Sequence, residues 1–125
     1  MNDVRFVNLT PHPIVVRRED GSELTIPAAG KPFRLEEEDI ETGLDIDGVP
    51  LVVRRFKFPE EIPAEFEDPD NIVIVSLPVL QVLKQMGLRF PALVVAPDTG
   101  KGAIRDESGK IIGTTRFILV QGADD

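Results

Sequence analysis

The sequence predicts an α+β fold: a mostly antiparallel β-sheet with one helix packed on it, formed by residues 1–125 as a single domain. Three observations predict it. Apolar and polar residues alternate with a period of two along most of the chain, which is typical of strands. Only residues 76–87 have the apolar spacing of a helix. A chain of 125 residues with 42% hydrophobic and 29% charged residues has the size and composition of one globular domain.

The first half of the chain is predicted to form short strands joined by tight turns. The alternation predicts strands at residues 4–9, 14–18, 24–26 and 33–35. Asp20-Gly21 and Asp47-Gly48 predict hairpin turns, because glycine there supplies the positive φ that such a turn requires. The second hairpin is expected to join residues 44–46 to residues 49–53 and to continue to residue 58.

Acidic residues are concentrated in two runs. Eleven of the 22 acids lie at residues 36–41 and 60–70, which contain no Lys or Arg. Both runs are predicted to be solvated surface loops. The remaining 11 acids stand against 14 basic residues, so the rest of the chain carries +3 while the whole carries −8.

The second half of the chain is predicted to contain the buried strand and the helix. Residues 71–75 are nearly all apolar and β-branched, as in a strand covered on both faces. Ser76 is expected to cap a helix that ends at Gly87. Its apolar stripe is expected to belong to the core and consists of Val79, Val82, Leu83 and Met86. Further strands are predicted at residues 92–95, 103–106, 110–113 and 114–120.

Composition excludes several classes of protein. The chain has no cysteine, hence no disulfide, thiolate nucleophile or Cys-based zinc site. No apolar run approaches the roughly 20 residues that cross a bilayer, and the first residues lack the pattern of a signal peptide, so no membrane contact and a cytoplasmic location are expected. Duplex nucleic acid is disfavoured because its binding needs a large positive surface.

Motifs for catalysis, metals and cofactors are also missing. The single histidine, His12, is the only residue around which a Ser-His-Asp triad could form, and no Gly-x-Ser-x-Gly elbow is present. Gly100-Lys101-Gly102 lacks the remaining residues of a phosphate loop. The sequence therefore predicts no metal, no cofactor and no enzyme activity.

Two segments contain residues suited to binding. Residues 8–13 hold one histidine between two prolines, which stiffen the backbone. Either Thr10 and His12 shape a local turn, or they present donors to a ligand. Residues 98–113 hold Arg105-Asp106 among glycine turns. Either an ion pair closes a hairpin there, or the arginine is aimed at a phosphate.

Four segments, at residues 7–15, 26–35, 72–76 and 95–113, resemble in order a family of small phage and prophage proteins. The specific parts are Asn8-Leu9-Thr10-Pro11-His12 and Arg105-Asp106-x-x-Gly109-x-Ile111-x-Gly113. Within that family the chain most resembles the Thoeris anti-defence sponge proteins of phages. Those proteins capture the cyclic ADP-ribose signals of bacterial TIR enzymes, and some take cyclic oligonucleotides, in pockets formed where subunits meet. The resemblance implies sequestration without cleavage, a homo-oligomer of two or more copies, and the host cytoplasm.

The resemblance also implies a ligand site of eight residues. Two arginines match positions suited to gripping phosphates, because a guanidinium group contacts a diphosphate in a bidentate manner. Three residues near the end of the chain are placed to read ribose hydroxyls or base edges, and three near the start shape the pocket or its frame. The eight are Arg34 and Arg105; Asp98, Thr99 and Asp106; and Asn8, Thr10 and His12.

Two other functions stay open. A phage accessory or virion-associated protein would act through protein–protein binding, by way of an exposed strand edge, and would have no affinity for a small molecule. A metal-free phosphodiesterase would use His12 as a general base and would turn its ligand over. We rank the sponge first, the accessory protein second and the enzyme third.

Overall fold

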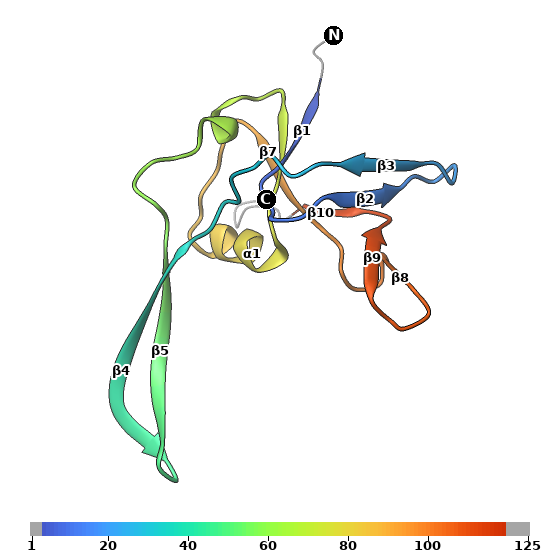
Figure 1. The fold of residues 1–125 in the computed structure, drawn as a ribbon. Helices are drawn as coiled ribbons and strands as arrows, with labels where there is room; N and C mark the ends of the chain where they lie inside the picture. The colour runs from blue at the N-terminus through green and yellow to red at the C-terminus, as the bar shows by residue number, and fades with distance from the viewer. Residues whose placement is uncertain (1–3, 120–125) are drawn as a thin grey trace.

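The computed structural model describes residues 4–119 and contains ten strands, one α-helix and one short 3₁₀ helix (Figure 1). The elements of the first half are β1 (Arg5–Asn8), β2 (Ile14–Arg17), β3 (Glu23–Ile26), β4 (Glu36–Ile46), β5 (Val49–Lys57) and the 3₁₀ helix η1 (Ala64–Glu67). Those of the second half are β6 (Asn71–Ile74), α1 (Leu77–Gln85), β7 (Leu93–Pro97), β8 (Ala103–Arg105), β9 (Ile111–Thr114) and β10 (Phe117–Leu119). The strand predicted to end at residue 120 thus ends at Leu119, and Val120 lies outside the described residues.

A central sheet has the strand order β1-β6-β7-β10. β1 pairs with β6 and β6 with β7 in parallel, and only β10 runs antiparallel to its neighbour. The prediction of a strand-rich α+β chain with one helix is therefore confirmed, but the sheets are mixed, and antiparallel pairing does not dominate in the central sheet. The reason is connectivity: β6 and β7 are joined through α1, and a helical crossover returns the chain in the same direction.

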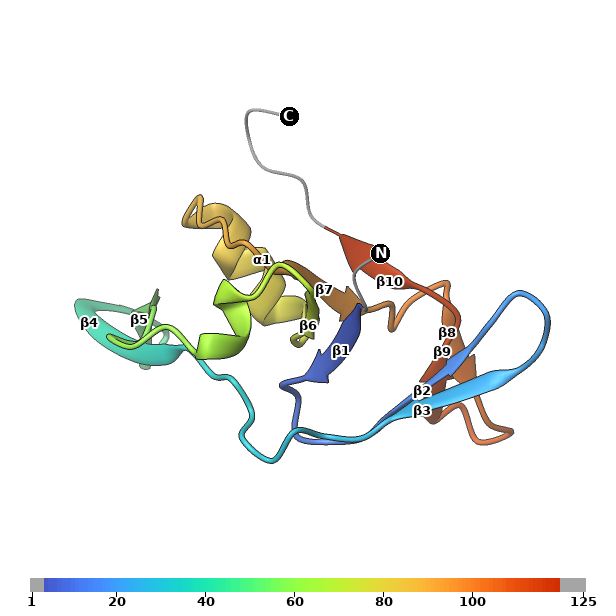
Figure 2. The same ribbon diagram turned by 90° about the horizontal axis from the view of Figure 1, so that it is seen from above.

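Two smaller sheets flank the central one. The order β3-β2-β9-β8 joins two hairpins through a parallel contact between Val16 and Thr114. β4 and β5 form a separate two-stranded antiparallel sheet, hereafter the arm. The arm extends away from the rest of the molecule, which we call the body (Figure 1). Seen from above, the arm and the β2–β3 and β8–β9 hairpins lie on opposite sides of the body (Figure 2).

The core has two parts, separated by the central sheet. Val73 and Val75 face α1 and the buried ring of Phe66, whereas Ile74 between them faces the β2–β3 hairpin. These three residues and Phe66 have no exposed surface. A strand covered on both faces reads as an unbroken apolar run, as the sequence predicted for this segment.

The acidic run at residues 36–41 is a strand, not the predicted loop. Conversely, residues 33–35, predicted as a strand, lie outside any strand and lead into β4. The acids remain solvated, as expected, because nearly every side chain of the arm is exposed. They form a strand because β5 offers a partner with Arg54, Arg55 and Lys57 opposite Asp39, Glu38 and Glu36. Opposite charges across a ladder are favourable, and the acidic sequence alone does not reveal its partner.

The helix lies where the sequence predicts it, but a different stripe is buried. Leu80 and Leu83 belong to the core, Val79 and Val82 are half-buried, and Met86 is exposed. The prediction that the stripe belongs to the core is therefore confirmed for Leu83 and for Val79, which packs against the core cluster, and is wrong for the exposed Met86. Gly87 ends the helix as expected, with a φ of +70° that favours glycine. No helix within residues 4–119 is both long and apolar enough to cross a membrane.

Candidate functional site

A groove of about 640 Å³ lies where the arm joins the body. Its volume falls within the range of small-molecule sites. Four segments line it: the loop after β1, the segment leading into β4, the base of the arm, and the start of α1. The lining residues are Leu9, Thr10, Pro11, Pro32, Phe33, Arg34, Leu35, Glu37, Phe56, Ser76, Pro78, Val79 and Val82.

The start of α1 gives one end of the groove a positive character. Ser76 is the N-cap, and its side chain makes no capping hydrogen bond. Helix geometry leaves the first N–H groups, including those of Leu77 and Val79, without a partner inside the helix. Pro78 has no N–H to satisfy, which explains why it is tolerated there. Unpaired N–H groups together with the helix dipole favour an anion at this place.

Arg34 is the cation of the groove. Phe33 is held by a hydrogen bond from its N–H to the carbonyl of Leu9 (2.8 Å), and its ring packs on Phe66. Arg34, the next residue, is exposed and lines the groove together with Phe33. Within residues 4–119, Arg34 makes no ion pair or hydrogen bond. Its guanidinium therefore has all its donors available for a ligand.

Other arginines of the body are engaged. Arg5 pairs with Asp68, Arg17 with Glu23, and Arg116 with Asp98. Each of these cations has a carboxylate partner that a ligand phosphate would have to displace. Arg34 is distinguished from them by its place in the groove and by its lack of a partner within the described range.

The side chain of Asn8 holds the loop beside the groove in its conformation. This side chain is buried; its amide group donates to the carbonyls of His12 (2.9 Å) and Ile26 (3.2 Å). Its Oδ1 accepts from the N–H (3.0 Å) and the hydroxyl (2.6 Å) of Thr10. Asn8 thus has no free capacity for a ligand. It fixes Thr10, which lines the groove, whereas His12 contributes its carbonyl to the frame and is not among the lining residues.

The other predicted residues form a second cluster, around Asp98. This buried carboxylate accepts from the N–H groups of Gly100 (2.7 Å) and Gly102 (3.0 Å) and from Nε of Arg116 (2.6 Å). Above all, the Arg116 hydrogen bond holds the pKa of Asp98 below its ordinary value, and the two N–H groups act in the same direction. The carboxylate stabilises the loop and is already saturated with donors.

Arg105 and Asp106 are likewise used within their own hairpin. Oδ1 of Asp106 accepts from the hydroxyl and N–H of Ser108 and from the N–H of Lys110, and the Ser108 hydroxyl is the largest cause of its lowered pKa. Arg105 donates to the carbonyls of Gly109 (2.7 Å) and Thr99 (3.4 Å). The two glycines of the closing motif have structural causes: Gly109 has a φ of +88°, and a Cβ on Gly113 would lie 2.8 Å from the carbonyl oxygen of Val15.

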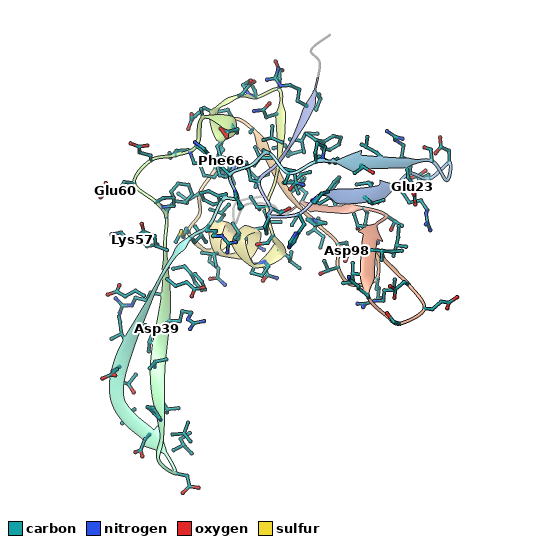
Figure 3. The ribbon with its side chains drawn as sticks, viewed as in Figure 1. Glu23, Asp39, Lys57, Glu60, Phe66 and Asp98 are labelled. Atoms are coloured by element: carbon teal, nitrogen blue, oxygen red, sulfur yellow. The ribbon has the colours of Figure 1, made fainter. Side chains whose placement is uncertain are left out.

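The eight predicted site residues therefore fall into two groups. Thr10 and Arg34 meet in the groove, with Asn8 behind Thr10 and His12 beside it. Asp98, Thr99, Arg105 and Asp106 lie together next to β8, on the side of the body opposite the arm (Figures 2 and 3). Within one copy of the chain the two groups do not form a single site. That any of them binds a ligand stays a prediction.

Several groove residues were not among those predicted. The sequence predicts Glu37 in a loop, the start of α1 only as a helix cap, and Val79 and Val82 as core residues; Val79 does pack against the core and also lines the groove. One sequence signal was available: Ser76 followed by Pro78 marks a helix whose first N–H groups need partners from elsewhere.

Comparison with protein-family models, with curated proteins and with solved structures finds no match to this chain. The assignment of a site therefore depends on geometry. The part of the chain that the structure describes holds no group of three or more His, Asp or Glu residues able to bind a metal ion.

Proposed function

We propose that the groove binds a small anionic ligand of the nucleotide type and holds it without cleaving it. The observation that carries the proposal is the Arg34 guanidinium, which has no partner among residues 4–119, in a groove of about 640 Å³ that also contains the N-terminus of α1. An arginine and a helix N-terminus are two favourable partners for phosphate oxygens.

The remaining lining suits the uncharged part of such a ligand. Phe56, Val79 and Val82 offer apolar surface for a base, and the hydroxyl of Ser76 offers a hydrogen-bond partner for ribose. Oγ1 of Thr10 donates its proton to Asn8 and can serve a ligand only as an acceptor. Glu37 is the one acid of the lining, and it lies 3.8 Å from Arg54, which offsets part of its charge. The resemblance of the sequence to phage sponge proteins makes cyclic ADP-ribose-type molecules, then cyclic oligonucleotides, the first ligands to test.

The test is a thermal-shift and calorimetric titration of the protein with isomers of cyclic ADP-ribose and with cyclic di- and trinucleotides. Ligand at about 100 times its Kd should stabilise the fold by roughly 2.7 kcal/mol. Arg34→Ala should weaken binding at least tenfold and leave the melting temperature of the free protein unchanged, because Arg34 is exposed and unpaired within residues 4–119. Chromatography of the ligand released by heat separates capture from cleavage.

Arg18→Ala is the matched control. Arg18 is also an exposed arginine of the body, but it lies in the β2–β3 turn, where its guanidinium donates to the hydroxyl of Ser22 (3.2 Å). It should bind every ligand as the unchanged protein does. Equal loss in both variants would show a general charge effect, and an intact protein that binds none of these ligands would overturn the proposal.

A second candidate is a phage accessory protein that acts through protein–protein binding. One observation favours it: the arm exposes large apolar side chains, including Leu44 (64% exposed) and Ile46 (65%). This candidate gives a flat thermal-shift screen and a partner protein that is lost when these two side chains are replaced.

A further inference from the structure

The arm has one polar and one apolar face. Cross-strand partners share a face, and β5 alternates between the two. Glu37, Asp39 and Glu41 share the polar face with Phe56, Arg54 and Val52. The alternate positions form the apolar face, which carries four charged residues at the base of the arm and six apolar residues beyond them. The six are Ile40, Leu44, Ile46, Val49, Leu51 and Val53.

The apolar face is uncovered. Leu44, Ile46 and Val49 are each more than 60% exposed, and the arm shares no core cluster with the body. A lone two-stranded hairpin is marginally stable in water, so strands of 11 and 9 residues need a third element against one face. Isolated exposed apolar residues are ordinary, but a continuous face of six marks an interaction site.

The body does not lie on this face. Glu37 and Phe56, which line the groove beside α1, belong to the polar face, so the body adjoins the arm on that side. The apolar face points away from the groove, and another molecule can approach it along its length. Figure 1 shows the arm standing clear of the body.

At the base of the arm, the charged residues of the two faces differ in whether they form ion pairs within the chain. On the polar face, Arg54 is paired within the chain with Asp39 (2.9 Å) and Glu37 (3.8 Å). On the apolar face, Glu38 lies opposite Arg55 and Glu36 opposite Lys57, but none of these four forms an ion pair among residues 4–119. Figure 3 labels one residue of each set, Asp39 and Lys57.

The apolar face, with its charged residues at the base, is complementary to the same face of a second copy. A two-fold axis running along the arm, between two apolar faces, places β4 of one copy against β5 of the other. Glu38 and Glu36 then face Arg55 and Lys57 of the second copy at the same level, because they are cross-strand partners within each copy. A surface that matches its own two-fold image is the requirement for an isologous dimer.

We propose that the apolar face of the arm is a dimer interface and that a second copy of this chain covers it. The proposal is independent of any ligand in the groove. β4 is about 37 Å long at ~3.4 Å per residue, and a two-stranded face is about 10 Å wide, so the two faces together cover roughly 700 Å². That area corresponds to a weak dimer, which dissociates on dilution.

Sedimentation velocity between about 1 μM and 1 mM tests the proposal. The unchanged protein should move from the 13.8 kDa monomer to a species of twice that mass. Val53→Lys should weaken association at least tenfold, because it places a charge in the apolar face. Val52→Lys is the matched control: Val52 is equally exposed (50% against 46%), is adjacent in the chain, and lies on the polar face.

A charge exchange separates contacts between copies from contacts within one. Arg55→Glu and Glu38→Arg should each self-associate less than the unchanged protein, and their equimolar mixture should recover association as a mixed dimer. A loss caused inside one hairpin would not be recovered by mixing, and circular dichroism of each variant reports whether the hairpin folds. A monomer at every concentration, equal effects of Val52→Lys and Val53→Lys, or no recovery in the mixture would overturn the proposal.

Discussion

The polar side chains of the predicted ligand site mostly hydrogen-bond to the backbone of their own loops. Asn8, Asp98 and Asp106 each accept or donate several hydrogen bonds within their loops. Such residues fix loop geometry by replacing the water that an open turn would bind. A pattern such as Asn-Leu-Thr-Pro-His therefore predicts a rigid loop well, but it does not distinguish a loop-forming side chain from a ligand-binding one.

Asn8→Ala should destabilise the protein by about 1 to 3 kcal/mol, because it leaves the N–H of Thr10 and the carbonyl of Ile26 without their partner in a buried place. His12→Ala should change stability by less than about 0.5 kcal/mol, since the exposed His12 takes part through its backbone carbonyl. Urea unfolding measures both. A larger loss for His12→Ala would show that the imidazole, not the carbonyl, supports the loop.

At the scale of elements, the Asp98 loop depends on a glycine. A Cβ at Gly102 would lie 2.8 Å from both Oδ2 of Asp98 and Cγ of Arg116, and so would separate that ion pair. Gly102→Ala should therefore cost about 1 to 3 kcal/mol. Gly100→Ala, whose Cβ would meet only Oδ1 of Asp98 at 3.3 Å, should cost less. Comparable unfolding midpoints for the two variants would contradict this account of the loop.

The same loop makes the stability of the protein depend on pH in the acidic range. The pKa of Asp98 is lower in the folded than in the unfolded chain, chiefly because Arg116 donates to it. Its contribution to stability is therefore complete above the ordinary aspartate pKa of about 3.9 and is lost as the pH falls through the folded value. Thermal unfolding between pH 5.5 and 2.5 should show a smaller loss for Asp98→Asn than for the unchanged protein. Equal losses of thermal stability in the two proteins would show that Asp98 does not cause the pH dependence.

The elements were predicted from the sequence to different extents. The β2–β3 and β8–β9 hairpins and β6 follow from local turn residues and apolar runs, which act over a few neighbours. The acidic β4 does not, because its stability as a strand depends on charges 15 residues or more along the chain, such as Arg54 opposite Asp39. The sequence does not predict the groove for the same reason: its four lining segments are separated in sequence, and only Thr10 and Arg34 of its lining belong to the predicted ligand site.

At the scale of the whole molecule, Phe66 joins the parts of the body. Its ring is fully buried, and the ring centroids of Phe33 and Phe90 lie 5.1 Å and 4.7 Å from its own. The sequence predicts an acidic surface loop for the segment that contains Phe66. Figure 3 shows Phe66 within the body, above the base of the arm. Burial of this ring, which removes a large apolar area from water, brings the 3₁₀ helix η1 into the core although six acids lie in the same segment.

Phe66→Ala should cost about 3 to 5 kcal/mol, a large part of the stability of a domain this size. Phe56→Ala is the comparison, because Phe56 lies on the arm and is 39% exposed, and it should cost less than about 1 kcal/mol. Chemical unfolding followed by circular dichroism measures both. Similar costs would place Phe56 in the folding core and contradict the division between body and arm.

The parallel pairing of β1 with β6 also affects how the chain is made. Arg5 and its partner Asn71 are 66 residues apart, so a ribosome adding 5 to 20 residues per second delivers the partner roughly 3 to 13 s after β1. During that interval the first strand waits with its ladder unpaired, whereas the arm can close as soon as residue 57 emerges. The β2–β3 hairpin can close still earlier, once residue 26 emerges, so both hairpins can form before the central sheet to which β1 belongs.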